Sequence, residues 1–290
     1  MKLHNEDCIE QMQKMIDEGV QVDSVVTDPP YELGFMGKSW DSTGIAFQKE
    51  TWELALQLLK PGGHLLAFGG SRTYHRMAVA IEDAGFQIRD QIMWLYGSGF
   101  PKSHNLGDGW GTALKPAHEP IVMARKFIEG TNKNNREKYG TGGINIDGCR
   151  VELSEDDDPR LGGKGTWKTD KAGKEIYDVG FTGEDIGSSE LGRFPANVMH
   201  DGSEEVMSEF AKYGERKSCT SPSKATPEGK IFKGKRNQGN LPMDSGTAAR
   251  FFYCPKVSKT ERGEDNTHPT VKPQELMKYL CRLIKNTKPS

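Results

Sequence analysis

The sequence predicts an α/β fold with a mainly parallel sheet that helices cover on both faces. Over residues 1–126, short apolar runs alternate with amphipathic helical segments, and this rhythm requires crossover connections between strands. A chain of 290 residues is long enough for about two domains, or for one domain with a large insertion. The 34% of apolar residues and the 34 glycines lie within the ordinary globular range. We therefore expect a sheet domain and a second region of different character.

The expected elements of the sheet domain follow from local patterns. A β-branched run at 22–27 predicts a strand. Residues 47–60 predict a helix, because Trp52, Ala55 and Leu59 share one face. The Pro-Gly-Gly sequence at 61–63 should end this helix before an apolar strand at 64–68. The remaining elements are expected to be a helix over 72–84 that ends at Gly85, and strands over 87–96 and 120–124.

Residues 127–250 differ from the sheet domain in composition and in hydrophobic periodicity. They hold more than half of the 34 glycines, with long polar stretches and weak periodicity. Such a region is either loop-rich and ordered by a partner, or partly disordered. Within it, residues 212–236 carry eight basic residues against two acidic ones. This segment is either a solvated charged surface or a segment that contacts phosphates.

Regular patterns return near the end of the chain. Residues 250–254 suit a strand, and residues 273–285 suit a helix. Pro273 at the first helical position is a start signal. One stripe of the helix is apolar and predicts a buried face, with Leu276, Tyr279, Leu280, Leu283 and Ile284.

Composition and short motifs exclude several classes of function. Lys plus Arg number 39 and Asp plus Glu number 41, so the net charge of −2 limits any polyanion site to a local basic patch. The five cysteines are scattered and the seven histidines form no H-E-x-x-H pattern, so we expect reduced thiols and no metal. No apolar run approaches a membrane span, and the N-terminus lacks a signal-peptide core. We expect a cytoplasmic protein with no membrane partner.

The sharpest chemical feature follows the first strand and reads Asp28-Pro29-Pro30-Tyr31. Pro29 forces Asp28 into an extended backbone, and the two prolines offer carbonyls without competing N–H groups. The end of the strand thus becomes a rigid set of acceptors, the Asp28 carboxylate and the Pro29 carbonyl, beside the Tyr31 ring. Open α/β sheets place their ligands at this end of a strand. The alternative interpretation is an ordinary proline-rich turn.

Such a set of acceptors suits the exocyclic amine of a nucleobase. The lone pair of this amine is delocalised into the ring, so the nitrogen is a poor nucleophile. Two acceptors that bind its two hydrogens favour a pyramidal nitrogen with an outward lone pair. A stacked aromatic ring would hold the base in register.

Several segments resemble one known family, the S-adenosylmethionine-dependent DNA amino-methyltransferases. Residues 25–31 (Val-Val-Thr-Asp-Pro-Pro-Tyr) resemble motif IV of these enzymes, and residues 268–273 (His-Pro-Thr-Val-Lys-Pro) resemble motif X. Further similarity lies in residues 5–9, near the adenosine in such enzymes, and in residues 59–65 and 117–123. Residues 192–197 and 250–253 are reminiscent of phage and prophage members. The order of motif IV, recognition region and motif X is that of the circularly permuted beta class.

The resemblance implies a domain arrangement and a partner. A Rossmann-like methyltransferase sheet would comprise residues 1–126 and 251–290, and a loop-rich target-recognition region would comprise residues 127–250. Double-stranded DNA would be the substrate and S-adenosylmethionine the methyl donor. Aspartate rather than serine at position 28 indicates N6 of adenine, with N4 of cytosine as the alternative.

The resemblance also implies roles for individual residues. Asp28 and the Pro29 carbonyl would bind the target amine, and Tyr31 would stack on the flipped base. The cofactor-binding residues would be Asp7, Cys8, His268, Pro269, Thr270, Lys272 and Pro273. The DNA-binding residues would be Lys212, Arg216, Lys217, Lys230, Lys233, Lys235 and Arg236.

In the beta class, a strand with the glycine-rich motif I follows motif X, and the sequence ends at Ser290 without such a motif. Neither residues 35–38 nor residues 161–166 form a convincing substitute. We therefore expect half a cofactor pocket, an exposed sheet edge, and weak or no cofactor binding by this chain alone. The explanations are a truncated or incomplete sequence, a split enzyme completed by another chain, or a degenerate remnant. The expected protein partner is a second copy or a complementing chain that carries motif I. The alternative functions are methylation of RNA or of a protein amide, and a DNA-binding half without activity of its own.

Overall fold

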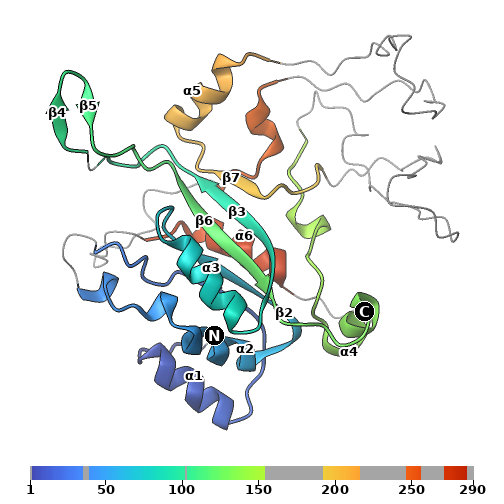
Figure 1. Cartoon of the computed structure of the whole chain (residues 1–290). Coiled ribbons are helices and arrows are strands. Elements are labelled where there is room, and N and C mark those ends of the chain that lie inside the picture. Colours follow the sequence, from blue (N-terminus) through green and yellow to red (C-terminus); the bar gives the residue numbers. More distant parts are fainter. Residues whose placement is uncertain are drawn as a thin grey trace, which may run out of the picture. The chain divides into compact units, whose positions relative to one another are not determined.

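The computed structural model describes residues 2–34, 39–101, 103–153, 192–215, 246–255 and 271–285 (Figure 1). The chain divides into two compact units. The first comprises Met1–Cys149, Ala196–Met207 and Tyr253–Ser290, and the second comprises Arg150–Pro195 and Ser208–Phe252. The first unit contains the five-stranded sheet and all residues of the site described below.

The sheet has the strand order β1-β2-β6-β3-β7. Its strands are β1 (Val22–Thr27), β2 (Leu59–Phe68), β6 (His118–Arg125), β3 (Gln87–Leu95) and β7 (Val198–His200). The pairs β1–β2 and β3–β7 are parallel, whereas β6 is antiparallel to both β2 and β3. The α/β class is confirmed, and four of the five described strands of this sheet run in the same direction, as expected for a mainly parallel sheet, while β6 runs opposite to them.

The antiparallel pairing has a simple cause in the connection between β3 and β6. This connection contains no helix and carries a short ribbon, β4 (Asn105–Gly107) and β5 (Trp110–Gly111), as Figure 1 shows. A parallel partner requires a crossover of a dozen or more residues, usually helical, whereas a strand that returns through a hairpin-like ribbon pairs antiparallel. The alternation of strands and helices in the sequence does not show whether a given strand pairs in the parallel or the antiparallel direction.

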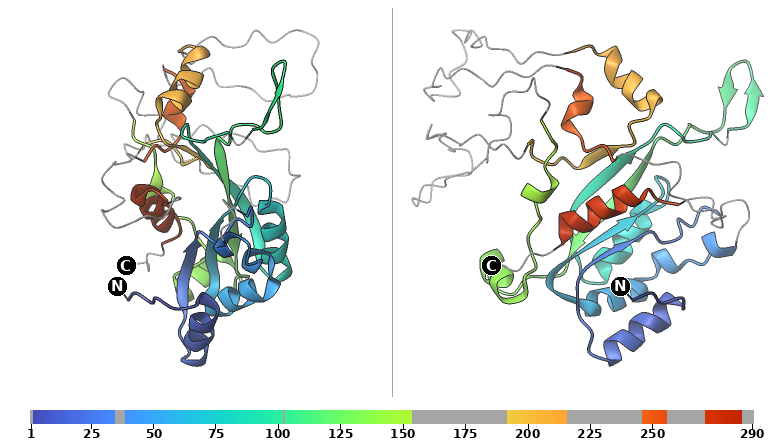
Figure 2. Two further views of the ribbon diagram at one scale, coloured as in Figure 1. Left: turned by 90° about the vertical axis from the view of Figure 1, so that its left-hand side faces the viewer. Right: turned by 180° about the vertical axis from the view of Figure 1, so that it is seen from behind.

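Helices cover both faces of the sheet, as predicted. The helices α2 (Lys49–Leu58) and α3 (Tyr74–Asp83) cover one face, with α1 (Cys8–Asp17) against α2, and α6 (Gln274–Ile284) covers the other (Figure 2). Side chains alternate along β2, so Leu65 and Ala67 join the core under α2 and α3. Leu66 and Phe68 join the core under α6, where all five residues of the predicted apolar stripe are buried.

The segment between α2 and β2 corrects one predicted boundary. The helix ends at Leu58, before the Pro-Gly-Gly sequence, but the strand already begins at Leu59 instead of residue 64. Leu59 pairs with Val22 and His64 pairs with Ser24, so the intervening residues form an irregularity in the register. Gly62 has φ +77°, a backbone that an L side chain rarely adopts, and this lets the chain bulge without leaving the sheet.

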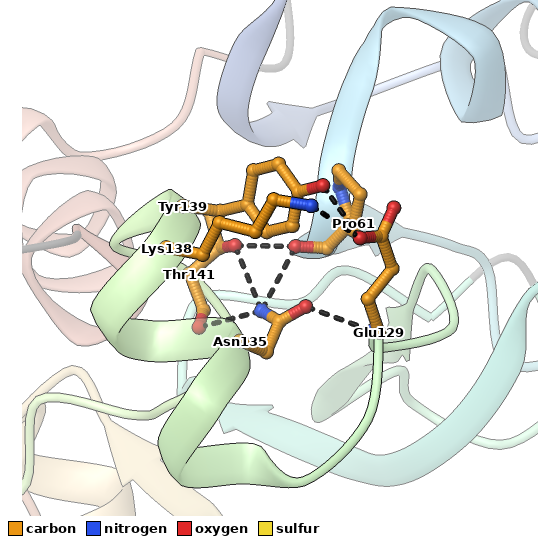
Figure 3. Close-up of polar contacts among 6 residues, drawn as sticks. All are labelled: Pro61, Glu129, Asn135, Lys138, Tyr139 and Thr141. Atoms are coloured by element: carbon orange, nitrogen blue, oxygen red, sulfur yellow. Dashed lines mark hydrogen bonds and ion pairs between the residues drawn. The ribbon is translucent and has the colours of Figure 1, made fainter.

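The helix α4 (Asn132–Tyr139) is attached to the first unit by a buried amide (Figure 3). Asn135 has no exposed surface, and its Nδ2 donates to the carbonyl oxygens of Pro61 at 3.1 Å and Thr141 at 3.0 Å. Its Oδ1 accepts from the backbone N–H of Glu129 at 3.0 Å. Residues 127–149 therefore belong to the same unit as the sheet, although the sequence placed them in the recognition region.

The remaining elements are short. They are α5 (Glu204–Lys212) and the 3-10 turns at Ser39–Asp41, Ile45–Phe47, Asp147–Cys149 and Ala248–Phe251. The strand expected over residues 250–254 was wrong, because the chain turns through Ala248–Phe251 and only Tyr253 forms a bridge, to Met199. Within the described part of the chain, no helix is long and apolar enough to cross a membrane.

Candidate functional site

The site begins where β1 ends, in a turn whose backbone is tightly held. Glu32 has φ +56°, which is uncommon for a residue other than glycine and often accompanies functional sites. The buried carboxylate of Asp41 accepts hydrogen bonds from the backbone N–H groups of Glu32 at 3.0 Å and Leu33 at 3.2 Å. This clamp fixes the path of the chain just after Tyr31.

Tyr31 is anchored at both its backbone and its hydroxyl. Its carbonyl oxygen accepts from the Thr73 hydroxyl at 2.7 Å, and its own hydroxyl donates to Glu119 Oε2 at 2.9 Å. Burial raises the pKa of the Tyr31 phenol well above its ordinary value, and the charges of Glu119 and Asp28 act in the same direction. The phenol therefore remains a neutral donor at physiological pH, and its ring has a fixed position.

Lys272 enters the site from the segment before α6. Its Nζ lies 3.0 Å from Asp28 Oδ2 and 3.2 Å from Glu119 Oε2. The Lys272 side chain is only 11% exposed, against 29% for Asp28 and 21% for Glu119. The ammonium also lies 5.1 Å from the centre of the Tyr31 ring and 5.0 Å from that of Phe68, within the range of cation–π attraction.

The site thus combines two carboxylates, one ammonium and an aromatic ring at the carboxyl end of β1. Asp28 is the most exposed of the three charged groups, so its carboxylate can be reached from solvent. Among the described residues, no hydrogen bond is made to the Pro29 carbonyl, which therefore remains an acceptor. The arrangement can bind a group with several N–H donors and an attached flat ring.

The structure brings the predicted catalytic residues together with one predicted cofactor residue. Asp28, Pro29, Pro30 and Tyr31 form one segment, and Lys272 contacts Asp28. Pro273 precedes the first turn of α6 as its N-cap. Asp7 is the N-cap of α1, and its Oδ1 accepts from the N–H groups of Ile9 at 2.8 Å and Glu10 at 3.2 Å.

Other predicted residues lie apart from this site or outside the described residues. Cys8 is an exposed residue at the start of α1, and partial burial of its thiol, together with the negative charge of Asp7, raises the pKa of the thiol. Lys212, the last residue of α5, is exposed and forms an ion pair with Glu209. The residues outside the described ranges are His268, Pro269, Thr270, Arg216, Lys217, Lys230, Lys233, Lys235 and Arg236, together with the glycine-containing segments 35–38 and 161–166.

Sequence reasoning missed Glu119, which links Tyr31 to Lys272. A signal was present, because Glu119 is a charged residue at the beginning of a strand whose following residues are all apolar up to Arg125. A carboxylate at the edge of a buried strand requires a partner. An aromatic residue outside this site, Trp110, is 74% exposed on the ribbon β4–β5.

Comparison with known proteins identifies one matching family and several similar proteins. A family model named N6_N4_Mtase, described as a DNA methylase, matches residues 22–288. The type II methyltransferase M.HpaI of Haemophilus parainfluenzae is 28% identical over 114 residues, which are 36% of this chain and 33% of that protein. The solved M1.HpyAVI–SAM complex is 22% identical with a TM-score of 0.32, and the match covers 43% of this chain and 53% of that one. TTHA0409 of Thermus thermophilus is 25% identical with a TM-score of 0.30, covering 47% and 59%.

The chain thus spans less than two thirds of each of these relatives. The family match, in contrast, extends over most of the chain and includes both Asp28 and Lys272. S-adenosylmethionine is the methyl donor of this family. The chain belongs to the N6_N4_Mtase family of DNA methylases.

Proposed function

We propose that this chain transfers a methyl group from S-adenosylmethionine to the exocyclic amine of a base flipped out of double-stranded DNA, with N6 of adenine as the target. The observation that carries the proposal is the solvent-reachable Asp28 carboxylate, which lies beside the Pro29 carbonyl and the fixed ring of Tyr31. A base must leave the stack for its amine to reach such a site.

The residues of the site have separate tasks in this reaction. Asp28 and the Pro29 carbonyl accept the two hydrogens of the amine, which directs the nitrogen lone pair away from them. Tyr31 stacks on the base, and its hydrogen bond to Glu119 holds the ring for this contact. When bound, S-adenosylmethionine would supply an electrophilic methyl group to this nitrogen, and its sulfur would keep the electron pair of the carbon–sulfur bond. The nitrogen then loses a proton, which Asp28 accepts and releases to solvent.

The described residues fit part of a cofactor site. Asp7 uses one carboxylate oxygen to cap α1, and that role leaves its second oxygen available for a ligand. Cys8 is exposed beside it. The strand β1, which leads to Asp28, pairs on one side only with a described strand, β2. We propose that a further strand with a glycine-rich loop lies against β1 and completes the site, supplied by more of the same chain, a second copy or a complementing chain.

We propose that the region 127–250 recognises the target sequence, including residues 127–149 that belong to the same unit as the sheet, and that the basic residues of 212–236 contact phosphates. Eight basic residues against two acidic ones in that segment support the assignment, because phosphate contacts supply much of the affinity for DNA. Lys212 would exchange its ion pair with Glu209 for a phosphate. The enzyme would act on DNA in the cytoplasm.

The test is to incubate the chain with unmethylated DNA and S-adenosylmethionine that carries a labelled methyl group. The DNA is then digested and its nucleosides are identified by mass spectrometry. The proposal predicts N6-methyldeoxyadenosine. N4-methyldeoxycytidine would support the cytosine alternative, and label in RNA or protein but not in DNA would contradict the proposal.

A further inference from the structure

Asp28 and Lys272 place a hydrogen-bond acceptor next to a donor at the end of β1. The two groups, Asp28 Oδ2 and Lys272 Nζ, are 3.0 Å apart. The carboxylate accepts and the ammonium only donates. A ligand that meets both groups must therefore present a donor and an acceptor side by side.

Lys272 is held in this position from several directions. Its side chain is 11% exposed, Glu119 lies on its other side at 3.2 Å, and the rings of Tyr31 and Phe68 flank the ammonium at 5.1 and 5.0 Å. The ammonium has three N–H bonds, and two of them serve the carboxylates of Asp28 and Glu119. Among the described residues, no further acceptor is found for this ammonium, so its third N–H is available for a ligand beside Asp28.

The bases with a methylatable amine have the complementary edge. In adenine, N6 and N1 are attached to the same ring carbon, and in cytosine N4 and N3 are attached to the same ring carbon. Each pair presents an amine donor beside an unprotonated ring nitrogen that accepts. We propose that Lys272 donates a hydrogen bond to the ring nitrogen next to the target amine while Asp28 accepts one from the amine. The ion pair would then recognise the amine and the neighbouring ring nitrogen together. This inference rests on the proposed function and names Lys272 as a residue that contacts the base.

The role of Lys272 is orientation and selection of the base. A cation on the ring nitrogen does not make the amine more nucleophilic. It does engage the lone pair of the ring nitrogen, which is the stronger nucleophile of the two, and so directs methylation to the amine. Glu119 contributes as a positioning residue, because its Oε2 accepts from both Lys272 and the Tyr31 hydroxyl.

The experiment uses the full 290-residue chain and duplexes that carry the target sequence, mapped beforehand by sequencing DNA that the chain has methylated. One duplex has adenine at the target, one has 1-deazaadenine, and one has 7-deazaadenine as a matched control that keeps N1. If the target is cytosine, 3-deazacytosine takes the place of 1-deazaadenine. We expect kcat/KM to fall about 10-fold to 100-fold with the 1-deaza base, the loss expected for one hydrogen bond from a charged donor, and to change little with the control.

The same duplexes are compared with Lys272→Met, because 1-deazaadenine also weakens the base pair in the duplex. This variant lacks the donor and should be insensitive to the ring nitrogen, while Lys272→Arg, which keeps a donor, should retain part of the sensitivity. Equal rates of the wild-type chain on adenine and 1-deazaadenine would overturn the inference, and so would equal analogue sensitivity in Lys272→Met. Absence of any methylated site in the mapping step would instead overturn the proposed function itself.

Discussion

The Tyr31 hydroxyl donates a hydrogen bond of 2.9 Å to Glu119, a residue 88 positions further along the chain. The bond joins the turn after β1 to the beginning of β6, and both residues also lie against Lys272. The position of the aromatic ring is therefore set by the same carboxylate that holds the lysine.

Substitution of Tyr31 separates the ring from its hydroxyl. Tyr31→Phe loses one hydrogen bond, worth about 1 kcal/mol, and should lower kcat/KM by less than about tenfold. Tyr31→Ala loses the stacking surface, worth about 1–3 kcal/mol per base, and should cost about 10-fold to 100-fold. Steady-state methyl transfer on DNA measures both. Equal losses in the two variants would show that stacking is not the task of this ring.

His64 in β2 predicts a dependence of stability on pH. Burial lowers the pKa of His64 from 6.5 to about 4, and the positive charges of Arg125 and Arg89 add to this effect. The unfolded chain therefore binds a proton between about pH 6.5 and pH 4 that the folded chain does not, so the free energy of unfolding falls as the pH falls through this window. The full loss is about 3 kcal/mol at 1.36 kcal/mol per pKa unit.

Denaturant titrations from pH 7.5 down to pH 4 measure this slope. His64→Gln removes the titrating group and should flatten it, whereas His75→Gln, on the exposed side of α3, is the control that should keep it. An unchanged slope in His64→Gln would assign the pH dependence to other groups.

Asn135 predicts a large effect of a single side chain on stability. Asn135→Ala leaves the buried carbonyl of Thr141 and the part-buried N–H of Glu129 without their amide partner, and should lower the free energy of unfolding by about 2–4 kcal/mol. The Pro61 carbonyl also loses the amide but still accepts from the Thr141 hydroxyl. The neighbouring Asn134 is exposed on α4, and Asn134→Ala is the matched control. Chemical unfolding gives both values, and similar small losses would show that the anchor in Figure 3 is unimportant.

Trp110 predicts a contact with DNA from the ribbon β4–β5. Its side chain is 74% exposed, so Trp110→Ala should leave the stability unchanged. If the indole stacks on a base, the same substitution should weaken DNA binding by about 1–3 kcal/mol. Fluorescence anisotropy with labelled duplex DNA measures the affinity. Leu106→Ala, 66% exposed on the same ribbon, is the aliphatic control. Unchanged affinity in Trp110→Ala would exclude the ribbon as a DNA contact.

Local patterns predicted the elements whose periodicity is strong. The stripe of α6 is buried as expected, and the strand at residues 22–27 ends directly before Asp28. The errors lie where a non-local pairing decides the structure. The helix ends at Leu58 and the strand begins at Leu59, because Leu59 pairs with Val22, so the Pro-Gly-Gly sequence forms a bulge inside the strand instead of separating the two elements. The antiparallel pairing of β6 depends on a connection whose form no periodicity reveals.

Prediction of the site from the sequence was limited in the same way, by contacts between residues far apart in the chain. The acceptors of residues 28–31 were predictable, because their geometry is local and fixed by proline. The contact of Lys272 with Asp28 was not, because it depends on how α6 packs across the sheet and no local pattern reports such a distance. Glu119 is the intermediate case, since its charge beside an apolar strand indicated a partner but not which one.

The central claim is that Asp28 binds the target amine, and the most direct measurement is single-turnover methyl transfer to unmethylated DNA by wild type, Asp28→Asn and Asp28→Ala. Exposed Asp83→Ala on α3 is the control. Loss of one positioned hydrogen-bonding group at a reacting centre typically costs about 100-fold to 1000-fold in rate, so we predict a loss of that size for Asp28→Ala. Asp28→Asn, which keeps one acceptor oxygen, should lose less, and Asp83→Ala should match the wild type. Methyl transfer by Asp28→Ala at the wild-type rate would contradict the claim.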